Sequence, residues 1–549
     1  MSGLFDNARR MLSRMRPVRV PEAPARSFRD LWPGDPTRGA RLLRGELEVM
    51  GSVRPFEGWG PDAGPLPWRA AAHGFAWLRD LRTLGTDAAR VEARDLAEDW
   101  LTRGAAEPLA NLPEVAAARI SAWLGHWDFF AASADDGFRR RLMQRLAQDG
   151  RHVAGSVPGE AAHRGALVVL KGAIAAAVAL GEEAWMVRAL KFLPAELERQ
   201  FHPDGGHVER SPVVQLLAFQ DLIELRNLLN GSGVMAPTQL ATVIDRAGQA
   251  LRLFRHGDGT LALFNGTREE PASLVDLVLT QGQAKGRAPL LLQETGFHRL
   301  AASRTLVILD GGAPPPERAA DPATGAPRGA DRFAHAGTLS FEMSIGRDRL
   351  IVNCGASPAS EEAWRDALRA TAAHSALILA DTNSAELRPE GLGRRPERVD
   401  VERYEANGAQ WLDASHDGWR RTHGAVHRRR LYLSENGDDL RGEDVLEPAS
   451  AAALPCVVRF HLHPAVTAVL QEEEGGVLMR LPTGQGWRLR ARGAAVSLEE
   501  SVYLGGEARR TSQIVLTAQG EAESIQWGIS RVAPTEPPPP PAPPAATND

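Results

Sequence analysis

The stretch Phe201-His-Pro-Asp-Gly-Gly-His-Val-Glu-Arg-Ser-Pro212 decides the architecture of the first half of this chain. Apolar residues recur at helical spacing on both sides of it, and its Pro-Asp-Gly-Gly run is typical of a turn. Ser211 before Pro212 predicts an N-cap and the first residue of a helix. The loop therefore holds an imidazole, a carboxylate and a guanidinium at a helix N-terminus, namely His207, Glu209 and Arg210. The alternative is an ordinary capped turn with solvated polar residues.

Helical periodicity continues outward from this loop in both directions. The segments that carry it are Trp68–Leu84, Ala88–Leu101, Pro113–Ala132, Gly137–Val153, Ala161–Leu180, Glu183–Phe201, Pro212–Asn230, Pro237–Phe254 and Ala272–Leu279. Successive helices of this kind predict an all-α domain.

Near residue 290 the period of the apolar residues changes from the helical value to two. Short apolar or alternating runs follow, separated by Gly, Asn and Asp: Arg304–Leu309, Thr338–Met343, Arg349–Val352, Ser375–Leu379, Arg429–Leu433 and Val457–Leu462. Many short strands with turns between them predict a large antiparallel β-sandwich. We therefore expect an N-terminal arm at 1–40, a helical domain at 41–290, the sandwich at 291–533 and a disordered, proline-rich tail at 534–549.

Composition excludes several classes of function. The net charge of −5 over 549 residues gives no global signal for nucleic acid. Two cysteines, Cys354 and Cys456, are too few for a disulfide scaffold, although one bridge between them stays open. All but three of the 64 basic residues are arginine, which suits planar anions, but a GC-rich genome produces the same bias. Tyrosine, a common general acid or base, occurs only at Tyr404, Tyr432 and Tyr503.

The sequence predicts neither a signal peptide nor a membrane span. The N-terminus has arginines and an amphipathic pattern but no apolar core. The most apolar internal run, Gly165–Gly181, contains Lys171 and Gly172 and is too short to cross a bilayer. We therefore expect a cytoplasmic protein.

Three further places could carry chemistry. His374 stands directly before an apolar strand, where a histidine is often only a satisfied surface group. Asn265 and Arg268 belong to a polar turn, a pattern more common in structural turns than in ligand contacts. His461 and His463 share one face of a strand, but no cysteines or carboxylates accompany them. We therefore expect no metal and no cofactor.

The helical first half and the β-rich second half, together with four motifs, resemble the heparinase II/III family of bacterial polysaccharide lyases. The motifs are Asp204–Pro212, Arg369–Ala376 around His374, Gly424–Arg430 and Arg441–Val445. The resemblance spans about residues 40–533 and implies an incomplete (α/α) toroid followed by an antiparallel β-sandwich. It also implies β-elimination on a uronate-containing acidic polysaccharide, bound between the two domains.

Such an elimination needs particular side chains. Asn or His neutralises the substrate carboxylate so that the C5 proton becomes acidic; Tyr or His removes that proton, and an acid protonates the leaving oxygen. The resemblance places the family histidine at His374. The expected tyrosine positions are Val213 and Val214, only His163 could replace the neutralising residue, and the zinc histidine of some members is Ala376.

Two interpretations stay open. In the first, the chain is a divergent lyase in which His207 and His374 act as base and acid. Glu209 orients one of them, and the substrate is bound by Arg210, His163, Asn265 and Arg268. In the second, the same cleft binds an acidic glycan without cleaving it, as an envelope-assembly protein would. If His207, His374 and Arg210 meet in one open cleft, catalysis is favoured; if His374 faces away, binding is favoured.

A hydrolase on a helical toroid is a third alternative. It needs two carboxylates about 5 to 9.5 Å apart, and Glu209 has only Asp204 and Glu269 as candidate partners. The resemblance also implies a different location from the one that the N-terminus predicts, because lyases of this family that act on polymers work in the periplasm or cell envelope.

Overall fold

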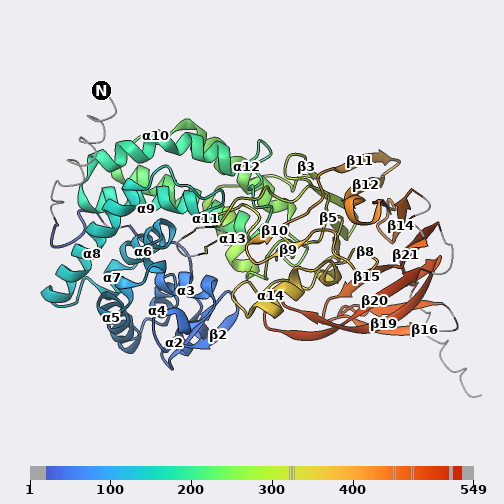
Figure 1. Ribbon diagram of the computed structural model, residues 1–549, viewed down its shortest axis with the longest axis horizontal. Helices are drawn as coiled ribbons and strands as arrows, with labels where there is room; N and C mark the ends of the chain where they lie inside the picture. Colours follow the sequence, from blue (N-terminus) through green and yellow to red (C-terminus); the bar gives the residue numbers. More distant parts are fainter. Residues whose placement is uncertain are drawn as a thin grey trace, which may run out of the picture.

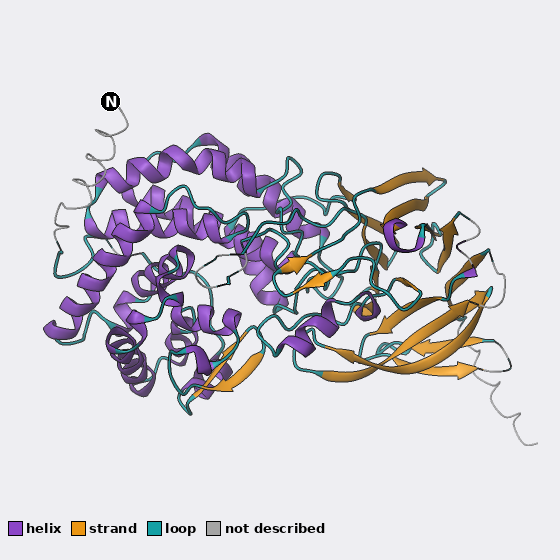
Figure 2. Ribbon diagram, in the orientation of Figure 1, coloured by secondary structure: helices purple, strands orange, loops and turns teal. Residues whose placement is uncertain are grey.

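The computed structural model describes residues 20–533 apart from 27, 321, 323, 324, 327, 449, 450, 452, 472, 474 and 519–522. Half of the predicted N-terminal arm, residues 1–19 and 27, and the whole predicted proline-rich tail lie outside the described residues. The molecule is elongated, with a helical body at one end (Figure 1) and a sheet-rich body at the other (Figure 2).

The helical body precedes residue 282 in the chain. A short hairpin, β1 (Glu46–Val49) and β2 (Ser52–Pro55), accompanies its helices. The helices are α2 (Pro36–Leu42), α3 (Leu66–His73), α4 (Leu78–Leu84), α5 (Asp87–Thr102), α6 (Pro113–Gly125), α7 (Trp127–Phe130), α8 (Asp136–Gly155), α9 (Gly165–Leu180), α10 (Glu183–Gln200), α11 (Pro212–Ser232), α12 (Thr238–Leu253) and α13 (Ala272–Gln281).

Helix α9 occupies the centre of this body. It packs against α6, α8, α10 and α11, and nearly all of its residues are buried. This position explains why its sequence is apolar on every face rather than amphipathic.

In the part of the chain that the structure describes, no helix is long and apolar enough to cross a membrane.

Two predicted helices are each divided in the structure. The segment Trp68–Leu84 forms α3 and α4, and Pro113–Ala132 forms α6 and α7. Between α3 and α4, Phe75 adopts a φ of 60°. Its buried ring packs against Trp59, Trp100 and Trp123 with centroid distances of 5.8, 5.6 and 5.3 Å. Aromatic contacts between distant segments therefore outweigh the local helical periodicity.

The sheet-rich body contains two large antiparallel sheets. Strands of one run in the order β19-β20-β15-β7-β6-β5-β4-β3, with β8 also paired to β15, and strands of the other run in the order β11-β12-β13-β14-β21-β18-β17-β16. A small hairpin, β9 (Leu387–Arg388) and β10 (Gly391–Leu392), and two short helices, α14 (Glu362–Arg369) and α15 (Arg420–His423), complete the body.

The strands of the two large sheets overlap every predicted strand segment, although residues 304, 338–340 and 375–376 lie outside them. They are β3 (Leu291–Leu292), β4 (Phe297–Ala302), β5 (Thr305–Asp310), β6 (Phe341–Ile345), β7 (Asp348–Val352), β8 (Leu377–Leu379), β11 (Val399–Ala406), β12 (Ala409–Trp419), β13 (Ala425–Leu433), β14 (Asp439–Glu447), β15 (Cys456–Leu462), β16 (Thr467–Gln471), β17 (Gly476–Arg480), β18 (Gly486–Arg492), β19 (Ala494–Tyr503), β20 (Arg509–Ala518) and β21 (Ser524–Arg531).

The two bodies share part of their hydrophobic core. Apolar side chains of both sheets meet inside the sandwich, where the rings of Phe341 and Trp527 stack with centroids 5.6 Å apart. Phe297, Leu306 and Ile308 of β4 and β5 instead belong to the core of the helical body. We keep the domain boundary near residue 290 as a proposal, since α13 ends before it and β3 begins after it.

Both cysteines are buried and free. Burial raises the pKa of the Cys354 thiol to about 12 and that of Cys456 to about 11. Both side chains are therefore unreactive thiols at neutral pH, and the bridge that the sequence left open is not formed.

Candidate functional site

Two neighbouring cavities lie between the helical body and segments of the sheet-rich body. The first has a volume of about 460 Å³ and lies between the N-terminus of α6, the connection from α8 to α9 and the segment around Arg328. The second, of about 250 Å³, lies between α3, the turn at Gly266 and α14. Leu112, Glu114 and Ala326 line both. We treat the two cavities as one candidate cleft.

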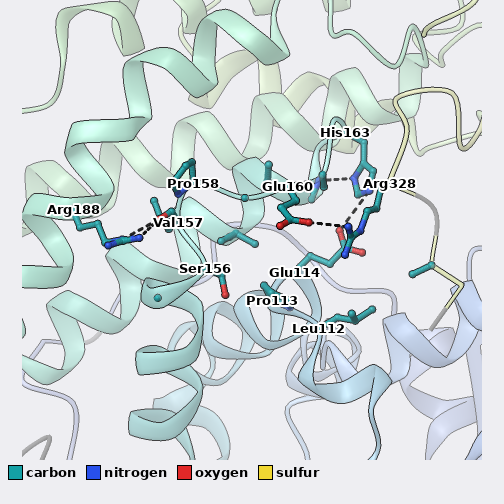
Figure 3. A pocket seen from close by; sticks show the side chains of 17 residues that line it. Leu112, Pro113, Glu114, Ser156, Val157, Pro158, Glu160, His163, Arg188 and Arg328 are labelled. Atoms are coloured by element: carbon teal, nitrogen blue, oxygen red, sulfur yellow. Dashed lines mark hydrogen bonds and ion pairs between the residues drawn. The ribbon is translucent and has the colours of Figure 1, made fainter. Parts of the chain in front are cut away.

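Four polar side chains give the first cavity its chemistry (Figure 3). Arg328 is ion-paired with Glu160 at 2.8 Å, and His163 Nε2 lies 3.7 Å from Glu114 Oε2. Figure 3 shows these four side chains close together, whereas Arg188 lies farther along and donates to the carbonyl oxygen of Val157. The cavity thus presents donors and acceptors side by side, with carboxylates and guanidinium groups balanced in charge.

His163 is oriented as a hydrogen-bond donor. The backbone N–H of Gly165 donates to His163 Nδ1 over 2.9 Å. This bond assigns the neutral ring a proton on Nε2, the nitrogen on the side of Glu114. His163 can therefore donate to a ligand carboxylate, but its neutral ring has no free lone pair with which to remove a proton.

Glu209 lies outside both cavities but positions a residue that lines the second one. It accepts hydrogen bonds from the backbone N–H of Arg164 and from Arg332 Nε, both at 2.8 Å. Burial by itself would raise the pKa of Glu209, but Arg332 and the neighbouring His163 and His207 lower it to about 2. Glu209 is thus a permanent carboxylate that positions Arg332, which lines the second cavity.

His207 is buried and also lies outside the cavities. Its Nδ1 accepts a hydrogen bond from the backbone N–H of Glu209 at 3.2 Å, and its ring packs against Phe201. Its Nε2 has no hydrogen-bond partner among the described residues. Burial lowers the pKa of His207 to about 4, so the ring is neutral at physiological pH.

Three residues that the sequence placed at the substrate lie in the framework instead. Arg210 is ion-paired with the buried Asp310 and donates to the carbonyl oxygen of Thr295 at 2.7 Å. Asn265 donates to the carbonyl oxygen of Arg210 at 3.0 Å. Arg268 is partly buried, and its guanidinium donates to the carbonyl oxygen of Gly506 at 3.5 Å. None of the three predicted residues lines either cavity.

His374 is separated from the second cavity by His335. Its Nδ1 donates to the carbonyl oxygen of Ala370 at 2.8 Å, and its Nε2 lies 3.0 Å from His335 Nδ1. His335 Nε2 accepts from the backbone N–H of Gly266 at 3.0 Å. These bonds assign both rings as neutral Nδ1–H tautomers, with His335 donating to His374.

Burial agrees with this assignment. It lowers the pKa of His374 to about 4 and that of His335 well below the ordinary value. Neither imidazole has a free lone pair. The structure therefore does not bring His207, His374 and Arg210 together in one open cleft.

No tyrosine lines the cavities. Tyr404 is exposed on β11, Tyr432 lies on β13, and the buried Tyr503 donates to Glu269. The positions where the family resemblance expects a tyrosine, Val213 and Val214, occupy the first turn of α11. The cleft thus lacks a phenol for proton transfer.

The histidines around His374 do not fit a metal ion. His461 Nδ1 lies 2.8 Å from Ser501 Oγ, and His461 Nε2 lies 2.9 Å from the carbonyl oxygen of Ala372. Both nitrogens of His374 are likewise engaged. Within the described ranges, no group of three or more His, Cys, Asp or Glu residues could hold a metal ion.

Sequence comparisons give the family. Residues 284–530 match the model described as heparinase II/III-like, C-terminal. FtsZ-localized protein C of Caulobacter vibrioides (strain NA1000 / CB15N) is 32% identical over 542 residues, which cover 93% of this chain and 91% of that protein. The chain belongs to the heparinase II/III-like family.

Solved structures of this family share the fold. The crystal structure of heparinase III matches with a TM-score of 0.71 and 14% identity, covering 96% of this chain and 89% of that one. A mutant of the heparan sulfate lyase HepC from Pedobacter heparinus matches with a TM-score of 0.60 and 14% identity, covering 91% and 83%. The predicted fold class, a helical toroid followed by an antiparallel sandwich, is confirmed.

Sequence reasoning missed most of the cleft wall. Of its predicted site residues only His163 lines a cavity, and it overlooked Glu114, Arg328, Arg332 and His335. Glu114 follows a proline in the first turn of α6 and looks like an ordinary helix start. The other three belong to the long segment 311–340 between β5 and β6. The unusual length of that segment was the available signal.

Proposed function

We propose that this heparinase-like chain binds a uronate-containing acidic glycan in the cleft without cleaving it. The observation that carries the proposal is the state of the cleft histidines. His163 and His335 both line the cleft, and neither has a free imidazole lone pair in its assigned tautomer. Membership of a polysaccharide lyase family supports a saccharide as the ligand.

The cleft retains one half of the elimination machinery. His163 Nε2–H and the neighbouring Arg328 are suited to a uronate carboxylate, which has two acceptor oxygens. The other half needs a base with a free lone pair about 3 Å from the C5 proton. In the structure His207 and His374 are buried behind the cleft, and no tyrosine lines it. Binding without elimination is the function that this geometry supports best.

A divergent lyase is the second candidate, and one observation favours it. The Glu114 carboxylate lies in the first cavity, 3.7 Å from His163, and could accept a proton beside a carboxylate held by His163. The mechanism based on His207 and His374 would instead require these side chains to leave the hydrogen bonds described above.

One experiment separates the two candidates. Purified protein is titrated with unsulfated and sulfated uronate polymers, and absorbance near 232 nm reports any unsaturated uronate. We expect saturable binding of at least one polymer without a rise in absorbance, and about tenfold weaker binding by His163→Ala. His423→Ala, in α15 and outside both cavities, is the matched control.

Each other outcome has a definite meaning. Absorbance that rises with wild-type protein and is lost in Glu114→Gln would establish the lyase. Absence of both binding and product for every polymer would refute a uronate ligand.

We also propose that the chain acts with the cell-division apparatus, in keeping with its envelope-assembly alternative. The support is its likeness to a protein named for localisation with FtsZ, which extends over nearly the full length of both chains. A fluorescent fusion expressed with labelled FtsZ should form a midcell band that disappears when FtsZ is depleted. A signal that stays uniform in dividing cells would count against this role.

A further inference from the structure

Strand β11 is an open edge of the β11-to-β16 sheet. It pairs with β12 along its length, from Val399 opposite His416 to Ala406 opposite Ala409. Within the described residues, no backbone hydrogen bond joins its other side to any segment. Figure 1 shows β11 at the outer margin of the sheet-rich body. Such an edge presents N–H and C=O groups with which another strand can pair.

A row of aromatic side chains leads across the outer face of the sheet to this edge. The register places Arg441 opposite Tyr432, Tyr432 opposite Trp411, and Trp411 opposite Tyr404. The Arg441 guanidinium lies 5.5 Å from the centre of the Tyr432 ring, and the rings of Tyr432 and Trp411 lie 5.1 Å apart. Tyr404, the last in the row, is 55% exposed. A further strand beyond β11 would cover it.

A neighbouring row of charged side chains on the same face also ends at β11. Glu443 lies opposite Arg430, and Arg430 opposite Asp413, with ion-pair distances of 2.7 and 3.3 Å. The next residue, Glu402 on β11, is another carboxylate opposite Asp413. Asp413 is also paired with Arg428 at 2.6 Å, whereas Glu402 accepts a hydrogen bond from the Tyr404 hydroxyl and has no cationic partner among the described residues. A basic residue on the far side of Glu402 would restore the alternation.

We propose that β11 is a docking edge for an extended segment of another protein. That segment carries a basic residue opposite Glu402 and an aromatic or aliphatic residue opposite Tyr404. Backbone pairing supplies affinity and the alternate side chains supply specificity. Tyr, Trp and Arg, the residue types of the row, are also those that dominate the energetics of protein interfaces.

Charge and ring geometry disfavour the other occupants. Besides Glu402, β11 carries Asp400 and Glu405 with only Arg403 in compensation, so pairing with a second copy would bring like charges together. The planes of Trp411 and Tyr432 are inclined at 49°, so the row is not a flat stacking surface for a saccharide. The edge residues do not line the glycan cleft, so this proposal stands apart from glycan binding.

The test uses full-length protein and two synthetic seven-residue peptides. In the first, valine alternates with one tyrosine and two lysines; in the second, glutamates replace the lysines. We expect the lysine peptide to bind at least about fivefold more tightly and to protect the amides of Val399–Ala406 from hydrogen exchange. Glu402→Lys should reverse the preference and leave glycan binding in the cleft unchanged.

Three results would overturn the proposal. The first is equal binding of both peptides, and the second is binding of the lysine peptide without protection of β11. The third is a dimer of the free protein in sedimentation that Tyr404→Ala abolishes, because it would identify a second copy as the occupant.

Discussion

At the residue scale, the ion pair between Glu209 and Arg332 connects stability to the wall of the cleft. Glu209 is buried, and within the described part of the chain Arg332 is the only guanidinium that pairs with it. Removing one member of such a pair leaves a buried charge without compensation, which costs more than the pair itself contributes.

Arg332→Met should therefore lower the free energy of unfolding at pH 7 by about 3 kcal/mol. The folded-state pKa of Glu209 is about 2, below its ordinary 4.5. Its stabilisation is thus complete above pH 4.5 and is lost as the pH falls towards 2. In Arg332→Met the free energy of unfolding should depend less on pH over this range. Denaturant titrations between pH 2 and 7 measure both effects.

Arg365→Met is the control for that variant, because Arg365 lines the same cavity but only forms loose ion pairs with Glu362 and Asp366 at 3.8 and 3.5 Å. Arg365→Met should lower the free energy of unfolding by less than about 1 kcal/mol. Equal losses in the two variants would show that the buried Glu209 pair has no special role.

The buried imidazole of His374 gives a second pH effect, with a different window. Its folded-state pKa is about 4, below the ordinary 6.5. The unfolded chain therefore binds the proton first, and stability falls as the pH drops from 6.5 towards 4. His374→Gln should reduce this slope by up to one proton. An unchanged slope in the variant would mean that His374 is already protonated in the folded protein.

At the element scale, the contact between α6 and α9 depends on a glycine that the sequence presented only as an interruption. A Cβ on Gly172 would lie 2.6 Å from the Cβ and 2.7 Å from the Cα of Ala117. The absence of a side chain lets the central helix approach α6, and this closeness is required by packing rather than by the local backbone.

Gly172→Ala should therefore lower the free energy of unfolding by about 2 kcal/mol, despite the better helix propensity of alanine. The control is Gly231→Ala in the last turn of α11, where a Cβ meets nothing within 4 Å. We expect that change to be neutral or slightly stabilising. Thermal unfolding followed by circular dichroism compares the two, and similar midpoints would contradict the packing argument.

The accuracy of the sequence predictions also varied by element. Helix α10 was predicted as Glu183–Phe201 and observed as Glu183–Gln200, because its apolar stripe and following turn are both local signals. The break between α3 and α4 escaped prediction because it depends on aromatic partners of Phe75 from distant segments.

At the scale of the whole molecule, the loop that links α10 to α11 also fastens the two bodies together. Arg210 reaches from this loop to Asp310 at the end of β5, and its guanidinium lies 4.8 Å from the centre of the Phe297 ring. Arg210 also has a φ of 52°, an uncommon value for a residue with a side chain. The interface between the bodies thus holds a residue that the sequence placed at the substrate.

Arg210→Met should destabilise the protein by about 3 kcal/mol, because Asp310 remains buried without its partner. Adding Asp310→Leu should recover most of this loss. Failure of the double variant to recover would indicate that Arg210 acts through contacts other than Asp310.

Since the two bodies share core residues, wild-type unfolding should be a single transition by both circular dichroism and tryptophan fluorescence.

The sequence by itself determined the order and class of the two bodies, because the period of 3.6 or 2 follows from helix or strand geometry and is present within each segment. It also determined that the helical body has no tyrosine. Tertiary structure alone decided which polar groups face the cleft and which imidazole nitrogens are free. Glu114, His163 and Arg328 come from three separate segments, and His374 is bonded to a histidine 39 residues away. Such hydrogen bonds between distant segments have no local pattern from which they could be predicted.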